Sequence, residues 1–183
     1  MVRQGDKITN VRTGQLMIFL KTGAETKGEL LQIECFSPLS PEREPEHIHP
    51  FQENSFEIIS GSCIFRLNGK EQVVEPGQSI HIPANVPHHF WNGGDTVAHY
   101  LQEFKPALKI DCFFETFFAL ARDGKLNKKG IPNFFHVSII GLAHKDEIRL
   151  TKPPWALQYI TYKILAPFGK LMGYRADYKS AMS

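Results

Sequence analysis

Two stretches of the chain carry histidines whose spacing is suited to metal binding. His47 and His49 are two residues apart, and His88 follows a Pro-Ala-Asn-Val-Pro sequence further along the chain. Successive side chains of a strand point to opposite faces, so His47 and His49 would share one face. Imidazoles aimed the same way from an extended backbone form part of a site for Fe, Mn, Ni, Cu or Zn.

These two stretches resemble the paired motifs of the cupins, G-x5-H-x-H-x3,4-E-x6-G and G-x5-P-x-G-x2-H-x3-N. The matching residues are His47, His49 and Gly61 in the first motif, and Gly77, Pro83, His88 and Asn92 in the second. Asn85 replaces the middle glycine of the second motif, which is a mild change because Asn tolerates a positive φ. Pro41 stands where the first motif begins with glycine. The resemblance covers about residues 28 to 106.

The resemblance implies a fold and a ligand set. The expected fold is an all-β jelly-roll barrel with an α-helical C-terminal extension. The expected metal ligands are His47, His49 and His88, which would bind a divalent transition metal whose identity the sequence does not give. The alternative is that the metal has been lost and that the histidines only line a polar pocket. Cupins host many reactions on one scaffold, so the motifs indicate the fold more strongly than the reaction.

The fourth ligand position departs from the motif. Counting back from Gly61, the glutamate of the family falls on Asn54, and Glu53 precedes it. In a regular strand Asn54 faces inward and Glu53 outward, so an amide oxygen would replace the carboxylate. A β-bulge that swings Glu53 inward is the competing interpretation. Gln52 shares the parity of Asn54 and is a third, weaker candidate.

Apolar residues of the same parity would line a substrate pocket. Phe56 and Ile58 follow Asn54 on its face, and Phe90 shares the face of His88; a plain core role is equally compatible with Phe90. His89 has the opposite parity and should lie outside the barrel. The remaining histidines have no partner at ligand spacing and are interpreted as structural; they are His81, His99, His136 and His144.

Many short alternating segments predict the barrel within residues 1–106. Leu31, Ile33 and Cys35 share a face, and Asn68-Gly69 between two alternating runs predicts a hairpin turn. Regularly spaced strands with such turns are typical of a sandwich or barrel.

The period changes after Pro106, and residues 107–183 are expected to form a helical extension. Ile110 to Ala121 is apolar at helical spacing, and Gly124 is a plausible stop. A second helix is expected over about Pro132–Lys145, and a third opens at Pro153-Pro154 and is expected to kink or end at Pro167. A helical set of this size rarely folds alone, so it should pack on the barrel or on a second subunit.

The third helix leaves an alternative open. Its mixture of aromatic and basic residues is compatible with a membrane surface, although docking on its own protein is more common. The pair Gly169 and Gly173 resembles a helix-packing motif, which is too short to support a prediction.

Composition excludes several classes of protein. The chain of 183 residues carries 21 basic and 19 acidic residues, a net charge of +2, which argues against a dedicated nucleic-acid surface. No stretch offers the roughly 20 apolar residues of a membrane span. Three scattered cysteines, Cys35, Cys63 and Cys112, are expected to be free thiols in a reducing compartment, and a cytoplasmic location is expected.

These features lead to a functional hypothesis with alternatives. We expect a metal-binding enzyme that acts on a small organic molecule and resembles the cupin dioxygenases. The alternatives are a non-catalytic module that binds or senses a small molecule, and a sugar isomerase or epimerase. The resemblance also implies a homodimer.

Overall fold

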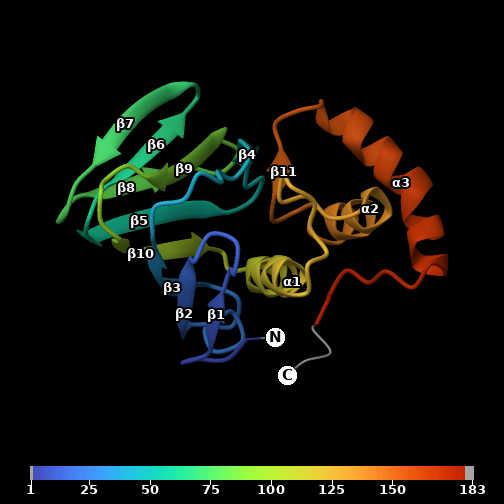
Figure 1. Ribbon diagram of the computed structural model, residues 1–183, viewed down its shortest axis with the longest axis horizontal. Coiled ribbons are helices and arrows are strands. Elements are labelled where there is room, and N and C mark those ends of the chain that lie inside the picture. Colours follow the sequence, from blue (N-terminus) through green and yellow to red (C-terminus); the bar gives the residue numbers. More distant parts are fainter. Residues whose placement is uncertain (1, 180–183) are drawn as a thin grey trace.

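Two antiparallel sheets form the barrel, and the computed structural model describes residues 2–179 (Figure 1). The first sheet has the order β1 (Lys7–Thr9), β2 (Leu16–Lys21), β3 (Leu31–Ser37), β10 (Ala98–Lys105), β5 (Glu53–Ser60) and β8 (Ser79–Ile82). The second has the order β11 (Arg149–Leu150), β4 (His47–Ile48), β9 (His88–Asn92), β6 (Cys63–Leu67) and β7 (Lys70–Val74). The predicted jelly roll with C-terminal helices is confirmed.

Alternation along the strands fills the space between the sheets. Leu31, Ile33 and Cys35 of β3 are buried as predicted, and β10 buries Tyr100 and Phe104 on its inner face. Every second side chain of these strands therefore points into one apolar core. A polar side chain that also points inward is then an exception that calls for an explanation.

Two turns have the backbone geometry that their residues favour. Asn68 and Gly69 have φ values of 49° and 79° and join β6 to β7, as the Asn-Gly pair predicts. Asn85 has a φ of 65°, in the left-handed region that Asn tolerates better than most residues. The Asn85 N–H donates to the carbonyl of His49 at 2.8 Å, so this turn ties the two histidine stretches together.

Helix α1 (Ile110–Arg122) packs on the barrel. Ile110 and Phe118 belong to the barrel's core cluster, and Phe113, Phe114 and Phe117 pack against it. The helix ends at Arg122, before Gly124 with a φ of 64°, close to the predicted stop. The division into a barrel of residues 1–106 and an extension of residues 107–183 stays a prediction.

Helices α2 (Phe134–Ala143) and α3 (Trp155–Leu171) pack against each other, and α3 lies at the rim of the molecule in Figure 1. Two glycines permit this close packing. A Cβ at Gly141 would lie 2.5 Å from the Tyr162 ring, and one at Gly169 would lie 2.9 Å from the carbonyl oxygen of Phe135. Gly169 therefore does serve helix packing, whereas a Cβ at Gly173 would meet no atom within 4 Å.

One helix boundary differs from the prediction. Helix α3 does not end at Pro167 but continues to Leu171. Pro167 is exposed, and its neighbours Ala166 and Gly169 are buried. Packing on α2 therefore outweighs the loss of one backbone hydrogen bond near the end of the helix.

The extension also contributes a strand that the sequence did not reveal. Strand β11 pairs with β4, with Leu150 opposite His47. A two-residue strand has too little alternation to be recognised in a sequence. Within residues 2–179, no helix is both long enough and apolar enough to cross a bilayer.

Candidate metal centre

Three histidines from two neighbouring strands meet inside the barrel. His47 opens β4, His49 directly follows it, and His88 opens β9 opposite His47. One potential ligand atom of each imidazole lies within 4.8 Å of those of the other two. The ring centroids are separated by 4.5 to 5.2 Å. The structure thus brings together all three histidines that the sequence singled out.

Main-chain carbonyls orient each of the three rings. The Nδ1 of His47 lies 3.0 Å from the carbonyl oxygen of Pro45, and that of His88 lies 2.8 Å from the carbonyl oxygen of Val86. The Nδ1 of His49 lies 2.7 Å from the carbonyl oxygen of Glu147. A carbonyl only accepts, so each Nδ1 carries the proton and each Nε2 keeps a free lone pair.

Burial keeps the three imidazoles neutral. It lowers the pKa of His47 and of His88 to about 4, and the charge of His47 further disfavours protonation of His88. Burial also lowers the pKa of His49 well below its usual value, with the charges of the other two histidines acting in the same direction. Neutral imidazole is the form that binds a metal ion, so near neutral pH no proton competes for the lone pairs.

One unsatisfied atom tests whether a metal fits. The Nε2 of His88 is fully buried and has no hydrogen-bond partner among the described residues. A buried polar atom without a partner is costly, and a divalent cation at the meeting point of the rings would satisfy it. The carbonyl contacts of the three rings are also the arrangement found around histidine ligands of metals. The residues present therefore fit a transition metal.

Asn54 and Glu53 lie as the alternation predicts. Asn54 is 2% exposed, whereas the side chain of Glu53 is 56% exposed and lies 3.9 Å from His81. The register of β5 with β10 is regular at these positions, so no bulge turns Glu53 inward. The Nε2 of Gln102 donates to the Oδ1 of Asn54 at 3.3 Å. Gln102 thus orients the amide, and nothing in the two motifs points to it.

Gln52 is buried, and only its amide nitrogen forms hydrogen bonds within the described residues. Its Nε2 donates to the carbonyl oxygens of Pro106 and Ala107, at 2.9 Å each, and its Oε1 is buried without a partner among the described residues. Its amide nitrogen therefore holds the segment that leads from β10 into α1.

Glu147 is a functional candidate that the sequence did not indicate. Its carbonyl oxygen holds His49, and its Oε1 accepts from the backbone N–H of Lys109 at 3.2 Å, just before α1. Burial raises the pKa of its carboxyl group. The residue lies between α2 and β11, so the extension takes part in positioning a barrel histidine.

The predicted pocket residues belong to the core of the barrel or pack against it. Phe56 and Ile58 are 1% exposed, and Phe90 is half-buried. The Phe56 ring contacts those of Phe65, Phe90 and Tyr100, with centroids 4.7 to 5.7 Å apart. A substrate-lining role for Phe56, Ile58 and Phe90 stays a prediction.

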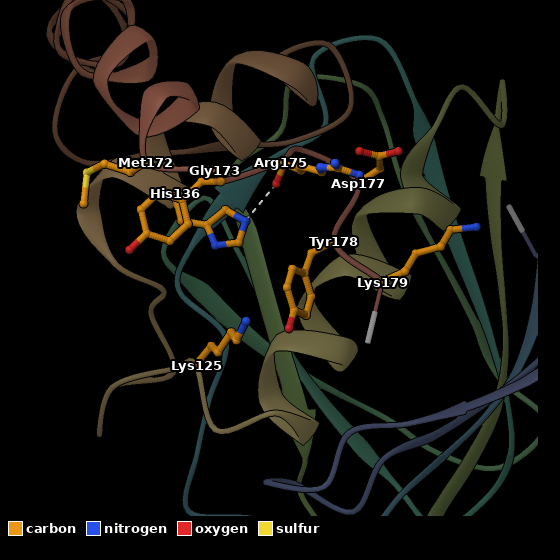
Figure 2. A pocket seen from close by; sticks show the side chains of 9 residues that line it. Lys125, His136, Met172, Gly173, Arg175, Asp177, Tyr178 and Lys179 are labelled. Carbon is orange, nitrogen blue, oxygen red and sulfur yellow. Dashed lines mark hydrogen bonds between the residues drawn. The ribbon is translucent and has the colours of Figure 1, made fainter. Parts of the chain in front are cut away.

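Two surface cavities lie away from these residues. One of about 480 Å³ is formed by Lys125, His136 and the segment after α3, and Figure 2 shows His136 bonded to the carbonyl of Arg175 in its wall. The other, of about 320 Å³, is lined by Arg66 of β6, His89 of β9, Leu150 of β11 and the segments just before β4 and just after β11. His89 therefore faces out of the barrel, as its parity predicts.

The remaining histidines make contacts that fit structural roles. His81 lies 3.1 Å from the hydroxyl of Ser55, and the Nε2 of His99 lies 2.8 Å from the carboxylate of Glu34. His144 is buried beside Phe113, and its Nδ1 has no partner in the described part of the chain. None of them joins the cluster of three.

Comparison with known sequences gives a family match over the barrel. Residues 38–102 match the family model described as a Cupin domain. The tetracenomycin polyketide synthase protein TcmJ from Streptomyces glaucescens is 32% identical over 82 residues, which are 44% of this chain and 52% of that protein. The chain therefore spans about half the length of this curated relative.

Solved structures with a similar barrel include two bacterial proteins. An RmlC-like cupin from Shewanella frigidimarina is 18% identical, with a TM-score of 0.49 over 61% of this chain and 93% of that one. A predicted oxalate decarboxylase from Thermotoga maritima is 21% identical, with a TM-score of 0.48 over 58% and 98% of the respective chains. Similarity at this level carries no argument about the reaction.

Proposed function

Because the chain belongs to the cupin superfamily, we propose that it is a metal-dependent enzyme acting on a small organic molecule, with chemistry of the dioxygenase type. The observation that carries the proposal is the buried Nε2 of His88, unpartnered among the described residues, beside two more imidazoles whose Nδ1 atoms are bonded to carbonyls. A bound divalent metal would supply a Lewis acid and a template for the substrate and O₂.

In this proposal each histidine has a defined task. His47, His49 and His88 present their Nε2 atoms to one point, and the carbonyls of Pro45, Glu147 and Val86 fix their tautomers. These carbonyls belong to the main chain, so side-chain substitution at Pro45, Val86 or Glu147 does not by itself remove them. The ring orientation is therefore preset before any metal binds.

Asn54 determines the charge of the proposed site. Three imidazoles and an amide leave the two positive charges of a divalent ion uncompensated, whereas a carboxylate would reduce them to one. The site should therefore bind metal more weakly than one with glutamate at this position, and attract an anionic substrate or enolate more strongly. Gln102 holds the amide oxygen of Asn54 in place.

The aromatic cluster would exclude water from the reacting groups. Phe56 and Ile58 would form the floor of the substrate pocket, and the half-buried Phe90 would form a wall that can yield to a ligand. We assign no acid or base among the side chains.

The remaining features of the proposal follow from the resemblance and the composition. We propose a homodimer in the cytoplasm, with its cysteines as free thiols, and no nucleic-acid partner. Sizing of the purified protein as a monomer at micromolar concentration would contradict the dimer.

Metal analysis of protein purified without chelators tests the central claim. We expect close to one equivalent of a transition metal, or full loading after reconstitution. Less than about a tenth of an equivalent, unrestored by reconstitution, would overturn the proposal. Oxygen consumption with flavonols, diketones or thiols then tests the reaction class.

A second function is favoured by one observation. The neutral Asn54 in place of a carboxylate is compatible with a module that binds or senses a small molecule without turnover. That function predicts metal and ligand binding without oxygen consumption, whereas turnover of any of the three substrate classes would exclude it.

A further inference from the structure

Helix α3 has two apolar faces, and only one of them is covered. Gln158, Tyr162, Ala166 and Gly169 are buried on the covered face. The opposite face exposes five large apolar side chains, each between 55% and 87% exposed, which we call the outer stripe. These are Leu157, Ile160, Ile164, Phe168 and Leu171.

The spacing of the outer stripe places it on a single line along the helix. At about 100° per residue, its five side chains fall within an arc of roughly 80°. Leu157 and Leu171 are separated by about 21 Å along the axis at the usual rise per residue. Isolated apolar residues are common on protein surfaces, but a contiguous row of this kind marks an interaction site.

Lysines lie along one flank of the outer stripe. Lys163 and Lys170 are exposed and lie on the same flank of the helix, next to the side of the stripe that Ile160 forms. Lys152 is exposed just before the helix begins, whereas the segment after α3 folds back against α1 and α2, where Thr116 and His136 bond its carbonyls. Residues 152–171 contain three basic residues and no acidic residue, so the segment has a net charge of +3.

We propose that the outer stripe lies on the surface of an anionic phospholipid bilayer. Apolar side chains of an interfacial helix enter the boundary between headgroups and acyl chains, while lysines on its flank reach the phosphates. The net charge of +3 over residues 152–171 complements a negatively charged leaflet. The helix would lie in the interface plane.

A second copy of the chain fits the outer stripe less well. A row about 21 Å long and roughly 10 Å wide offers some 200 Å², far below the roughly 800 Å² per partner of a stable interface. Two copies packed face to face would also bring Lys163 and Lys170 toward their equivalents. Residues 152–171 contain no acidic side chain that could offset this repulsion.

A protein groove that wraps a basic amphipathic helix is also less suitable. Such grooves enclose much of the helix, but the inner face of α3 is already packed on α2, with Gly169 against Phe135 and Ile139. A flat surface such as a bilayer needs to contact only the exposed face of the helix.

Vesicle sedimentation of the full chain tests the proposal. We expect binding to vesicles of phosphatidylcholine and phosphatidylserine at 7:3, at least about tenfold weaker binding to pure phosphatidylcholine, and release by salt. Ile160→Ser with Ile164→Ser should weaken binding at least about tenfold. Lys163→Gln with Lys170→Gln should weaken it roughly 20- to 30-fold, at about fivefold per charge.

Matched variants on the barrel serve as controls. Val73→Ser with Val97→Ser removes two exposed apolar side chains, and Lys7→Gln with Lys70→Gln removes two exposed charges. Both pairs should bind vesicles like the wild type, and all variants should keep their circular dichroism and metal content. The proposal is wrong if the wild type does not sediment, if it binds neutral vesicles equally well, or if the α3 variants bind unchanged. It is also wrong if Ile160→Ser with Ile164→Ser changes the protein from a dimer to a monomer without weakening vesicle binding.

Discussion

The barrel and the α2–α3 layer both bury histidines, yet they treat them differently. His47, His49 and His88 bond carbonyls through Nδ1, and their Nε2 sides face one another. His136 of α2 bonds the carbonyl of Arg175 through Nε2 and stacks on Tyr174, and it belongs to no cluster of three potential ligands among residues 2–179.

The difference shows what separates a packed histidine from a candidate ligand. Burial and a carbonyl partner are common to both regions and therefore do not identify a site. The informative signal is convergence together with a buried nitrogen that has no partner in the described part of the chain, as found at His88. His144 has such a nitrogen but does not converge with other histidines in the described residues, so it counts as a packed histidine. Four predictions test the comparison of the two regions, from the largest expected effect to the smallest.

Replacing one histidine in each region tests it most directly. His88→Phe keeps a ring of similar size but removes a ligand, so metal affinity should fall by at least about 100-fold. His136→Phe should leave the metal content unchanged. Metal analysis and competition with a chelator measure both variants. Equal metal content in the two would contradict the assignment of His88, and not His136, as a metal ligand.

Acid should destabilise the protein through His144. Burial lowers its pKa from about 6.5 to about 4, so between these values the unfolded chain binds more protons than the folded one. Stability is therefore lost as the pH falls through this window, by roughly 2.5 kcal/mol for this group at pH 4.5. His144→Phe should lose less stability than the wild type in urea unfolding at pH 7.5 and 4.5. Parallel losses would contradict the prediction.

A methyl group at Gly141 should disturb the helical layer and spare the metal centre. Its Cβ would lie 2.5 Å from the Tyr162 ring, so Gly141→Ala should lower the free energy of unfolding by about 1–3 kcal/mol. Combined with Tyr162→Ala the losses should be less than additive. Metal loss in Gly141→Ala would show that the two regions are coupled more closely than their contacts suggest.

Restoring a carboxylate at Asn54 should strengthen metal binding. If Asn54 is the fourth ligand as proposed, Asn54→Glu adds a negative charge to the site and the Nε2 of Gln102 can donate to it, so affinity should rise about tenfold. Glu53→Gln is the matched control and should have no effect because Glu53 is exposed. Calorimetric titration of metal-free protein measures both, and weaker binding by Asn54→Glu would place the amide away from the site.

The sequence predicted the features that depend on local pattern. Alternation placed Asn54 inside and Glu53 outside, the Asn68-Gly69 pair marked a hairpin, and helical spacing located α1. The three histidines were found because their side chains are chemically distinctive and their spacing matches a known motif.

Features that depend on the main chain or on distant packing were missed. The carbonyl that orients His49 has no side-chain signature, since any residue at position 147 offers one. Gln102 lies in a strand that no motif covers, and β11 is too short to alternate. Periodicity showed that α3 is apolar, but not that Gln158 and Tyr162 face inward while Ile160 and Ile164 face solvent.

The bond between His49 and Glu147 has a consequence for biosynthesis. The two residues are 98 positions apart, so at ribosomal elongation rates roughly 5–20 s separate their synthesis. A nascent chain that has exposed all three imidazoles still lacks the carbonyl that aims one of them, and it lacks the strand that flanks another. Metal loading should therefore follow translation of β11, so that a polypeptide stalled before residue 147 would carry its histidines without a finished centre.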